Sequence, residues 1–346
     1  MHRIFAVALM ALATPAFANG VITEFPGSGL IFKEAADIAI AREDLYVSRE
    51  KVTVHYDYVS GAAATQTVTI GFPMPPVPIN GDPDDPASLP ELEGKDLRNY
   101  MQFSARVSGE PVETTLHQFA WLNGEDITAR LAVLGIPAYL PYDQIEETFS
   151  RIDRATVDDM VEAGVISTDD ERTYIVPNWL YQSVYEWQQD FPPGETKVDI
   201  AYSPLAGYPS DFGTYYEDDP EGRYCVDDKL RKTIADFRDK NIGGYEVATV
   251  GYITTTATYW KGPIGEFNLT IGKDSIDAEN QQIGAETAFC GKPEFEETET
   301  ALTWTAKDYV PEKDISIVYY FFYDWDWDEQ EPEIVDEPGV LDDLQP

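Results

Sequence analysis

The sequence predicts a mainly β protein of the α+β class, built from two β-sandwich-like domains. Three observations lead to this prediction. Long stretches alternate apolar and polar side chains with a period of two, as strands with one buried face do. Turns rich in glycine and proline separate these stretches. Helical spacing is confined to a short three-helix insertion in the first domain, at about 126–168, and to one helix in the second, over 226–240.

The first 18 residues, MHRIFAVALMALATPAFA, have the pattern of a signal peptide. A short basic start precedes an apolar run from 4 to 13, which is too short to span a bilayer, and Ala16-Phe17-Ala18 fits the small-x-small cleavage rule. We therefore expect an exported protein, periplasmic or extracellular in a Gram-negative-type bacterium. No later apolar run approaches the ~18 residues of a membrane-spanning helix, so we expect no transmembrane segment in the mature chain.

The chain is strongly acidic. It has 63 Asp and Glu residues against 24 Lys and Arg residues, a formal net charge of -39. Such a charge repels nucleic acid and anionic membrane surfaces, so neither is an expected partner. It favours cations, basic partners and solubility. Adaptation to a salty habitat would produce the same composition, and both interpretations of the acidity stay open.

The chain contains two cysteines, Cys225 and Cys290. Two cysteines in an exported protein most often form one disulfide, and we expect this pair to do so. A histidine-based metal site is not expected. After signal removal only His55 and His117 remain, and neither has a second histidine at ligand spacing. No cofactor is expected apart from the calcium considered below.

The first domain is expected over 19–210, and its opening strands are the clearest. In KVTVHYDYVS, positions 52, 54, 56 and 58 place Val, Val, Tyr and Tyr on one face, opposite Thr53, His55 and Asp57. TQTVTIGF alternates likewise, and GAAA lies between the two, which predicts a hairpin with one buried face. The motif FPMP should end the second strand, because proline lacks the N–H group that strand pairing needs.

Three predicted helices interrupt this β-pattern between 126 and 168. EDITARLAVLG spaces its Ile and Leu residues as a helix does and closes on a glycine. LPYDQIEETFSRID and ATVDDMVEAGVIS supply the other two, the last with Thr156 as its N-cap and Gly164 as its stop. Because the flanking segments are β, we expect an insertion between strands.

The β-pattern then resumes and continues into the second domain. SVYEWQQDF, the turn FPPGET and the return strand KVDIAYSP end the first domain. The second is expected over 211–325, with the helix CVDDKLRKTIADFRDKN and several strands, of which ISIVYYFFY is the most apolar. The acidic, proline-bearing segment 326–346 is expected to be a poorly ordered tail.

Two acidic loops, NGDPDDP and YEDDPEG, are candidate cation sites. Calcium outside the cytoplasm is bound by oxygen ligands on flexible loops, and these loops are rich in carboxylates. Neither matches the EF-hand or RTX pattern, so solvated loops in a very acidic protein are the competing interpretation. The candidate ligands are Asp82, Asp84, Asp85, Glu217, Asp218, Asp219 and Glu221.

The sequence supplies no catalytic residue. His55 and His117 lie in alternating strands and are interpreted as solvent-facing, and neither a G-x-S-x-G elbow nor a glycine-rich phosphate loop is present. Among 63 acids almost any carboxylate spacing can be found. A glycosidase that uses two carboxylates therefore remains an alternative, although no catalytic residue is assigned to it. Acids and aromatic residues coincide in one cluster, for which a solvated loop in a very acidic protein is the competing interpretation: Tyr215, Tyr216, Glu217, Asp218, Asp219, Glu221 and Tyr224.

Several separated segments resemble those of a known family. They are GLIFKEAADIAIAREDLYVSREKVTVHYDYVS, VTIGFPMP, YEWQQDFPPGETKVDIAYSPLAG, WKGPIGEFNLTIGKD and DYVPEKDISIVYYF, in this order between about 20 and 323. Together they resemble an exported bacterial family catalogued as domain of unknown function 4424. The resemblance implies an exported protein; it implies no activity and no role for any residue.

These observations favour a non-catalytic periplasmic binding or envelope-associated protein. Its partner would be another envelope protein or a cation. A carboxylate-dependent enzyme acting on envelope or extracellular polysaccharide is one alternative, and a calcium-binding structural protein is another.

Overall fold

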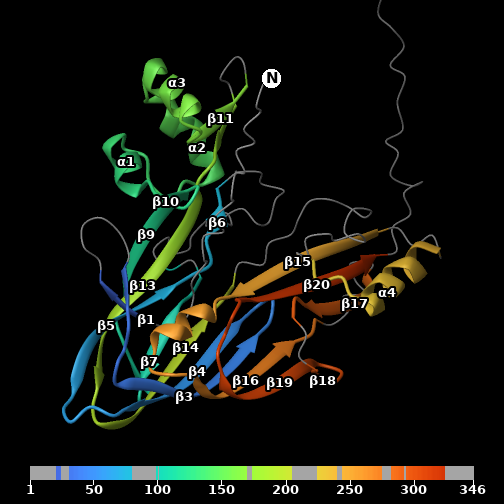
Figure 1. The fold of residues 1–346 in the computed structure, drawn as a ribbon. Coiled ribbons are helices and arrows are strands. Elements are labelled where there is room, and N and C mark those ends of the chain that lie inside the picture. The colour runs from blue at the N-terminus through green and yellow to red at the C-terminus, as the bar shows by residue number, and fades with distance from the viewer. Residues whose placement is uncertain are drawn as a thin grey trace, which may run out of the picture.

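The fold is mainly β, as predicted (Figure 1). The computed structural model describes residues 21–24, 31–79, 99, 101–169, 174–204, 224–239, 244–274, 282–291 and 294–323. The predicted signal peptide at 1–18 and the predicted tail at 326–346 lie outside these ranges.

The largest sheet has eight strands in the order β18-β19-β16-β3-β4-β14-β7-β8. In that order the strands are Glu296–Glu297, Ala301–Tyr309, Ile264–Gly272, Ile38–Val47, Val52–Ser60, Gly194–Tyr202, Ser104–Val107 and Glu110–Pro111. Neighbours are antiparallel except β16 and β3, which are parallel. The sheet therefore combines strands from both sides of residue 210, where a domain boundary was expected.

Three smaller sheets complete the β-structure of the described residues. A seven-stranded sheet has the order β10-β9-β13-β5-β1-β2, with β6 paired to β13, and a three-stranded sheet has the order β15-β20-β17. A two-stranded sheet joins β11 and β12. The strands are Val21–Glu24 (β1), Ile31–Lys33 (β2), Gln66–Pro73 (β5), Val77–Pro78 (β6), Thr115–Leu122 (β9), Glu125–Asp126 (β10), Ile166–Thr168 (β11), Ile175–Pro177 (β12), Leu180–Phe191 (β13), Gly244–Tyr252 (β15), Gln282–Phe289 (β17) and Ile315–Tyr323 (β20).

The three predicted helices of the insertion are present and gather at one end of the molecule (Figure 1). They are α1 (Thr128–Val133), α2 (Tyr142–Ser150) and α3 (Arg154–Glu162). Thr156 was wrongly predicted as the N-cap of α3. The cap is Asp153, whose carboxylate accepts the Thr156 N–H at 3.1 Å. Gly164, with φ at +68°, follows the end of α3 as predicted.

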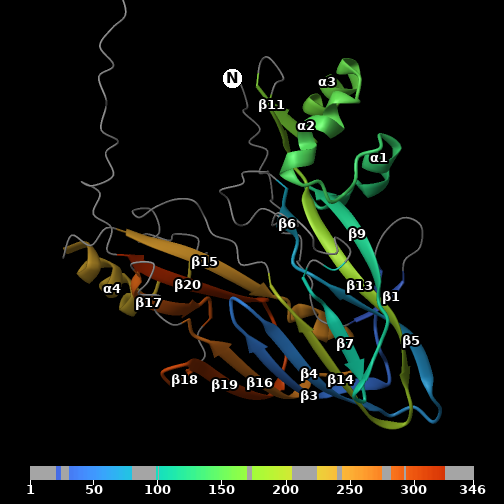
Figure 2. The same ribbon diagram turned by 180° about the vertical axis from the view of Figure 1, so that it is seen from behind.

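Two predicted hairpins are wrong in the same way. β4 and β5 follow each other in sequence but belong to different sheets, since β4 pairs with β3 and β14, whereas β5 pairs with β1 and β13. β13 and β14 are divided likewise. Both connections lie at the end of the molecule opposite α1–α3 (Figures 1 and 2). A period of two shows that a strand has one buried face. Two consecutive strands have this pattern whether they pair as a hairpin or lie in two different sheets that pack against each other.

The inner face of the eight-stranded sheet is covered by two other sheets. Over β4, the Tyr58 ring meets Phe191 of the seven-stranded sheet, with ring centroids 5.3 Å apart. Over β16, the Tyr319 hydroxyl of the three-stranded sheet donates to the Gly272 carbonyl at 3.1 Å. The two sandwich-like layers thus share one sheet, and one hydrophobic core runs between them.

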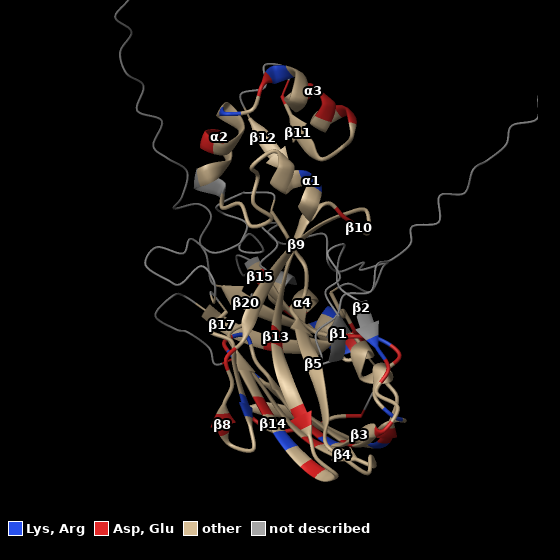
Figure 3. Cartoon of the chain, turned by 90° about the vertical axis from the view of Figure 1, so that its left-hand side faces the viewer, with Lys and Arg blue, Asp and Glu red and all other residues tan. Residues whose placement is uncertain are grey.

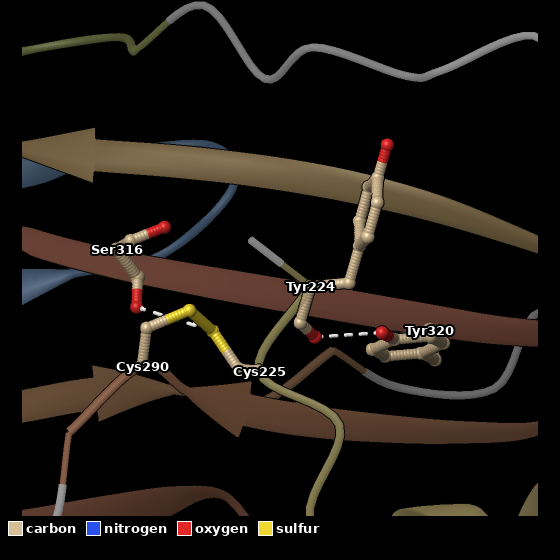
Figure 4. The surroundings of a disulfide bond; sticks show 5 residues. All are labelled: Tyr224, Cys225, Cys290, Ser316 and Tyr320. Atoms are coloured by element: carbon tan, nitrogen blue, oxygen red, sulfur yellow. Dashed lines mark hydrogen bonds between the residues drawn. A yellow bond between two sulfur atoms is a disulfide. The ribbon is translucent and has the colours of Figure 1, made fainter. Parts of the chain in front are cut away.

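The outer face of the three-stranded sheet is covered by α4 (Asp228–Asp239), which buries Leu230 and Ile234 there. Cys225, just before this helix, forms a disulfide with Cys290, just after β17 (Figure 4). Beside it, the Tyr320 hydroxyl donates to the Tyr224 carbonyl at 2.7 Å. The disulfide closes a loop with a sequence separation of 65, so the loop-entropy model gives a stabilisation of about 4 kcal/mol.

A β-bulge in β3 sets which of its residues face the core. The register with β4 shifts between Ile40 and Arg42, so Ala41 is an extra residue. At this point β16 has Gly265, where a Cβ would lie only 2.6 Å from the Ala41 carbonyl oxygen. Glycine is therefore needed for the backbones of β3 and β16 to approach beside the bulge.

We expect Gly265→Ala to lower the free energy of unfolding by about 2 kcal/mol, because the new methyl group must push β16 away from β3. Gly251→Ala is the matched control. Its Cβ would meet nothing nearer than a Pro75 carbon at 4.0 Å, and its effect should stay within about 0.5 kcal/mol. Chemical denaturation measures both, and equal losses in the two variants would contradict the proposed role of Gly265.

Candidate functional site

The residues predicted as cation ligands all fall outside the described residues. They are Asp82, Asp84, Asp85, Glu217, Asp218, Asp219 and Glu221. Among the residues that the structure describes, no three His, Cys, Asp or Glu side chains form a group able to hold a metal ion. No helix in the same part of the chain has the length and apolar character needed to cross a membrane.

A groove of about 480 Å³ lies on the outer face of the eight-stranded sheet. Its walls come from β3, β4, β7, β14 and β16, and its volume is in the range of small-molecule sites. Since residues along a strand alternate between the two faces, the side chains next to the buried Leu45, Val54 and Ile200 point outward and form the groove.

Five outward-facing residues form a row across the groove, which we call the charged row. The register places Asn268 beside Asp44, Asp44 beside His55, His55 beside Asp199, and Asp199 beside Arg106. Directly paired residues have Cβ atoms about 5 Å apart, so each side chain can reach the next. The row takes its members from β16, β3, β4, β14 and β7, of which only β3 and β4 follow each other in the sequence.

His55 bridges two carboxylates at the centre of this row. Its Nδ1 lies 2.6 Å from Asp199 Oδ1, and its Nε2 lies 3.2 Å from Asp57 Oδ1. Partial burial lowers the pKa of the imidazole, but the hydrogen bond and charge of Asp199, helped by Asp57, outweigh burial and raise the pKa above 6.5. Both ring nitrogens are therefore engaged by carboxylates.

Asp44 is held in a similar way by two donors. Arg42 Nε donates to both carboxylate oxygens at 2.9 Å, and Asn268 Nδ2 donates to Oδ1 at 2.7 Å. Partial burial raises the pKa of Asp44, yet these donors outweigh burial and the pKa is lowered. Figure 3 shows both acidic and basic segments around β3 and β14, two of the strands that form the groove.

A second row of hydroxyl-bearing residues lies beside the charged row. The register places Thr270 beside Tyr46, Tyr46 beside Thr53, and Thr53 beside Ala201, which is followed by Ser104. We call Thr270, Tyr46, Thr53 and Ser104 the hydroxyl row. Within the described part of the chain, the first three make no hydrogen bond through their hydroxyl groups. Ser104 Oγ donates weakly to the Ala201 carbonyl at 3.4 Å.

On the opposite face of β3, the neighbouring Glu43 is completely buried. One of its oxygens accepts the Tyr252 hydroxyl at 3.3 Å, and that hydroxyl also lies 2.9 Å from the hydroxyl of Tyr56. The other oxygen, Oε2, has no hydrogen-bond partner among the described residues. The bulge at Ala41 explains this position, because it sends Glu43 inward and Asp44 outward into the groove.

Burial is the main reason that the pKa of Glu43 is raised to about 8. The Tyr252 hydrogen bond lowers the pKa, and the nearby Asp44 charge raises it further. Burial also raises the pKa of Tyr56 and Tyr252 well above 10, so neither phenol supplies a charge here. At neutral pH Glu43 is therefore a neutral acid inside the core.

Sequence reasoning did not identify the groove. It placed Thr53, His55 and Asp57 correctly on the polar face of β4, but it interpreted His55 and His117 as plain solvent-facing residues. His117 Nε2 lies 2.5 Å from Glu186 Oε2, and His55 is paired with two carboxylates. Asp57 lies two residues from His55 on the same strand face, so the period of two could have indicated this partner. The cross-strand partners Asp199 and Glu186 become visible only once the strand register is known, and the sequence does not contain the register.

The fold and the groove define a class: a mainly β protein with a polar groove on the outer face of its largest sheet. The chain belongs to the family described as "Domain of unknown function (DUF4424)", whose model matches residues 18–318. No curated protein matches the chain.

Some solved structures are weakly similar. A "putative nutrient binding protein" from Legionella pneumophila shares 12% identity at a TM-score of 0.43, with 89% of this chain and 71% of that chain covered. An M1 zinc metallopeptidase from Deinococcus radiodurans shares 9% identity at a TM-score of 0.23, with 83% and 43% covered. The chain thus spans less than half of that peptidase, and at these TM-scores neither structure bears on function.

The buried Glu43 predicts a pH-dependent stability that Glu43→Gln should remove. Unfolded, Glu43 releases its proton near pH 4.5, whereas the folded protein retains it up to about pH 8. The contribution of Glu43 to stability is therefore fully present below pH 4.5 and falls as the pH rises to 8. The free energy of unfolding of Glu43→Gln should therefore rise by roughly 4 kcal/mol relative to that of wild type over this pH interval.

Urea denaturation at several pH values measures this difference, and comparison with wild type cancels the other acids of the chain. The exposed Glu113→Gln is the control and should run parallel to wild type. A constant difference between Glu43→Gln and wild type from pH 4.5 to 8 would show that Glu43 is ionised in the folded state.

Proposed function

We propose that this chain is an exported, periplasmic, non-catalytic binding protein whose ligand site is the groove on the eight-stranded sheet. Export is supported by the signal-like pattern of the first 18 residues. A periplasmic location would also suit the disulfide between Cys225 and Cys290, because that compartment is oxidising.

The observation that carries the non-catalytic assignment is the mutual engagement of the titratable groups in the groove. A histidine that acts as a general base needs a ring nitrogen that is free to accept a substrate proton. The two nitrogens of His55 are instead directed at Asp199 and Asp57, and Asp44 is held by Arg42 and Asn268. Such pairs fix the shape and charge of a surface, which suits binding.

The groove also has the size and position of a binding site. Its volume of about 480 Å³ would accommodate a small molecule or a short segment of a polymer. It rests on five hydrogen-bonded strands, so the backbone positions of its lining residues are fixed before a ligand arrives, which lowers the entropic cost of binding. A carboxylate-dependent enzyme acting on polysaccharide would need two carboxyl groups facing the substrate. Of the two carboxylates that line the groove, Asp44 is paired with Arg42, and only Asp199 keeps an oxygen beyond its contact with His55.

A groove-blocking variant tests the proposal. Thr53 lies centrally in the groove, and Thr53→Trp should fill it without altering the core. Thr115→Trp, at an exposed position of β9 in the seven-stranded sheet, is the matched control. Melting temperatures of the three proteins are compared in the presence of amino acids, short peptides, mono- and oligosaccharides, inorganic anions and calcium.

At least one of these molecules should raise the melting temperature of wild type and of Thr115→Trp, but not that of Thr53→Trp. The proposal is wrong if no molecule stabilises the wild type, or if Thr53→Trp responds as wild type does. Turnover of any molecule by wild type, with loss of turnover in Thr53→Trp, would establish the groove as an active site and overturn the non-catalytic assignment.

A further inference from the structure

The charges of the chain restrict what the groove can attract. The net charge of -39 creates a field that on average disfavours the approach of anions. The groove itself has no excess of cationic groups to overcome this field. Its lining includes two carboxylates, Asp44 and Asp199, and two side chains that can be cationic, His55 and Arg106.

The carboxylates of the groove are also poorly suited to a cationic ligand. Asp44 is already paired with Arg42, and Asp199 with His55. Asp57, the other carboxylate on His55, lies 3.6 Å from Lys197 Nζ. An incoming cation would have to compete with a protein cation for each carboxylate, so it would gain little net electrostatic energy.

The groove contains uncharged hydroxyl groups that are available for hydrogen bonds to a ligand. The hydroxyl groups of Thr53, Thr270 and Tyr46 have no hydrogen-bond partner within the described residues, and each can both donate and accept. Asp199 is about half-exposed, and its Oδ2 can accept further hydrogen bonds beside the one that Oδ1 makes to His55. The matching ligand is uncharged and presents several closely spaced groups that donate as well as accept.

Tyr46 adds an exposed aromatic surface to the wall of the groove. Its side chain leans over the end of β16, where a Cβ on Gly272 would come within 2.5 Å of the Tyr46 hydroxyl. The residue is 37% exposed although it stands in the middle of a sheet. An aromatic ring at this place can pack against an apolar patch of a ligand whose rim is polar.

We propose that the groove binds a neutral saccharide, with sugar hydroxyls bonded to the hydroxyl row and to the free oxygen of Asp199, and an apolar sugar face against Tyr46. This inference rests on the proposed function and names the ligand class of the same site. Sugars fit because each hydroxyl donates one hydrogen bond and accepts others at close spacing, while the ring carbons expose C–H surface.

The test uses the full mature chain and three sets of oligosaccharides of matched length: neutral, uronic-acid-containing and free-amine-containing. Dissociation constants are measured by calorimetry for wild type, Thr53→Trp and Thr115→Trp. Neutral oligosaccharides should bind wild type and Thr115→Trp alike and bind Thr53→Trp at least about tenfold more weakly. Their affinity should change less than about twofold between low and high salt, because no net charge is exchanged.

Two variants at Tyr46 test the contacts. Tyr46→Ala should weaken binding of the neutral sugar by about tenfold, whereas Tyr46→Phe, which retains the ring, should lose less. Equal loss in both variants would contradict packing against the ring.

The outcomes separate the two proposals. Preferred binding of the amine-containing or acid-containing set at the groove, with strong salt dependence, overturns the neutral-saccharide inference and leaves the binding function standing. The same holds if no oligosaccharide binds but another molecule stabilises wild type and not Thr53→Trp. If no probe of any class binds at the groove, both proposals fall.

Discussion

The parallel pairing of β3 with β16 is the contact on which the rest of the structure depends. β3 comes from the start of the chain and β16 from its last third, and their register runs from Arg42 beside Glu266 to Val47 beside Ile271. The close approach of Gly265 to Ala41 allows this pairing at the bulge. Because of it, strands from both halves of the sequence form one sheet, and the three-stranded sheet packs on the same inner face as the seven-stranded sheet.

The bulge at Ala41 links this architecture to the groove. Residues 38 and 40 face the core, and a regular strand would continue with 42 and 44 inward. The extra residue instead turns Glu43, Leu45 and Val47 to the inside, where all three are buried. Asp44 therefore faces outward beside His55, and a carboxyl group is left in the core as a neutral acid. One backbone irregularity thus sets both the charged row and the pH-dependent element beneath it.

The sequence was sufficient to predict individual strands and helices, but it was not sufficient to predict which strands pair with each other. Alternation predicted the strands that became β4, β5, β13 and β14, and helical spacing predicted α1 to α4, because both patterns are local consequences of burying one face. The period of two does not record which strand lies beside another, so consecutive strands were paired as hairpins although they belong to different sheets. For the same reason the groove was not predicted, because its charged row joins the consecutive strands β3 and β4 to β7, β14 and β16, which come from distant parts of the chain. The acidic loops proposed for calcium lie outside the described residues.

If one sheet supports the groove, its strands should open together. Native-state hydrogen exchange, followed by NMR at increasing denaturant, gives an opening free energy for each slowly exchanging amide. The account predicts one common value for paired amides of β3, β4, β14 and β16, merging with global unfolding. A distinctly lower common value for β16 and β19 than for β3, β4 and β14 would contradict it. The second half of the chain would then be a separate cooperative unit, and the groove would be a contact between two units.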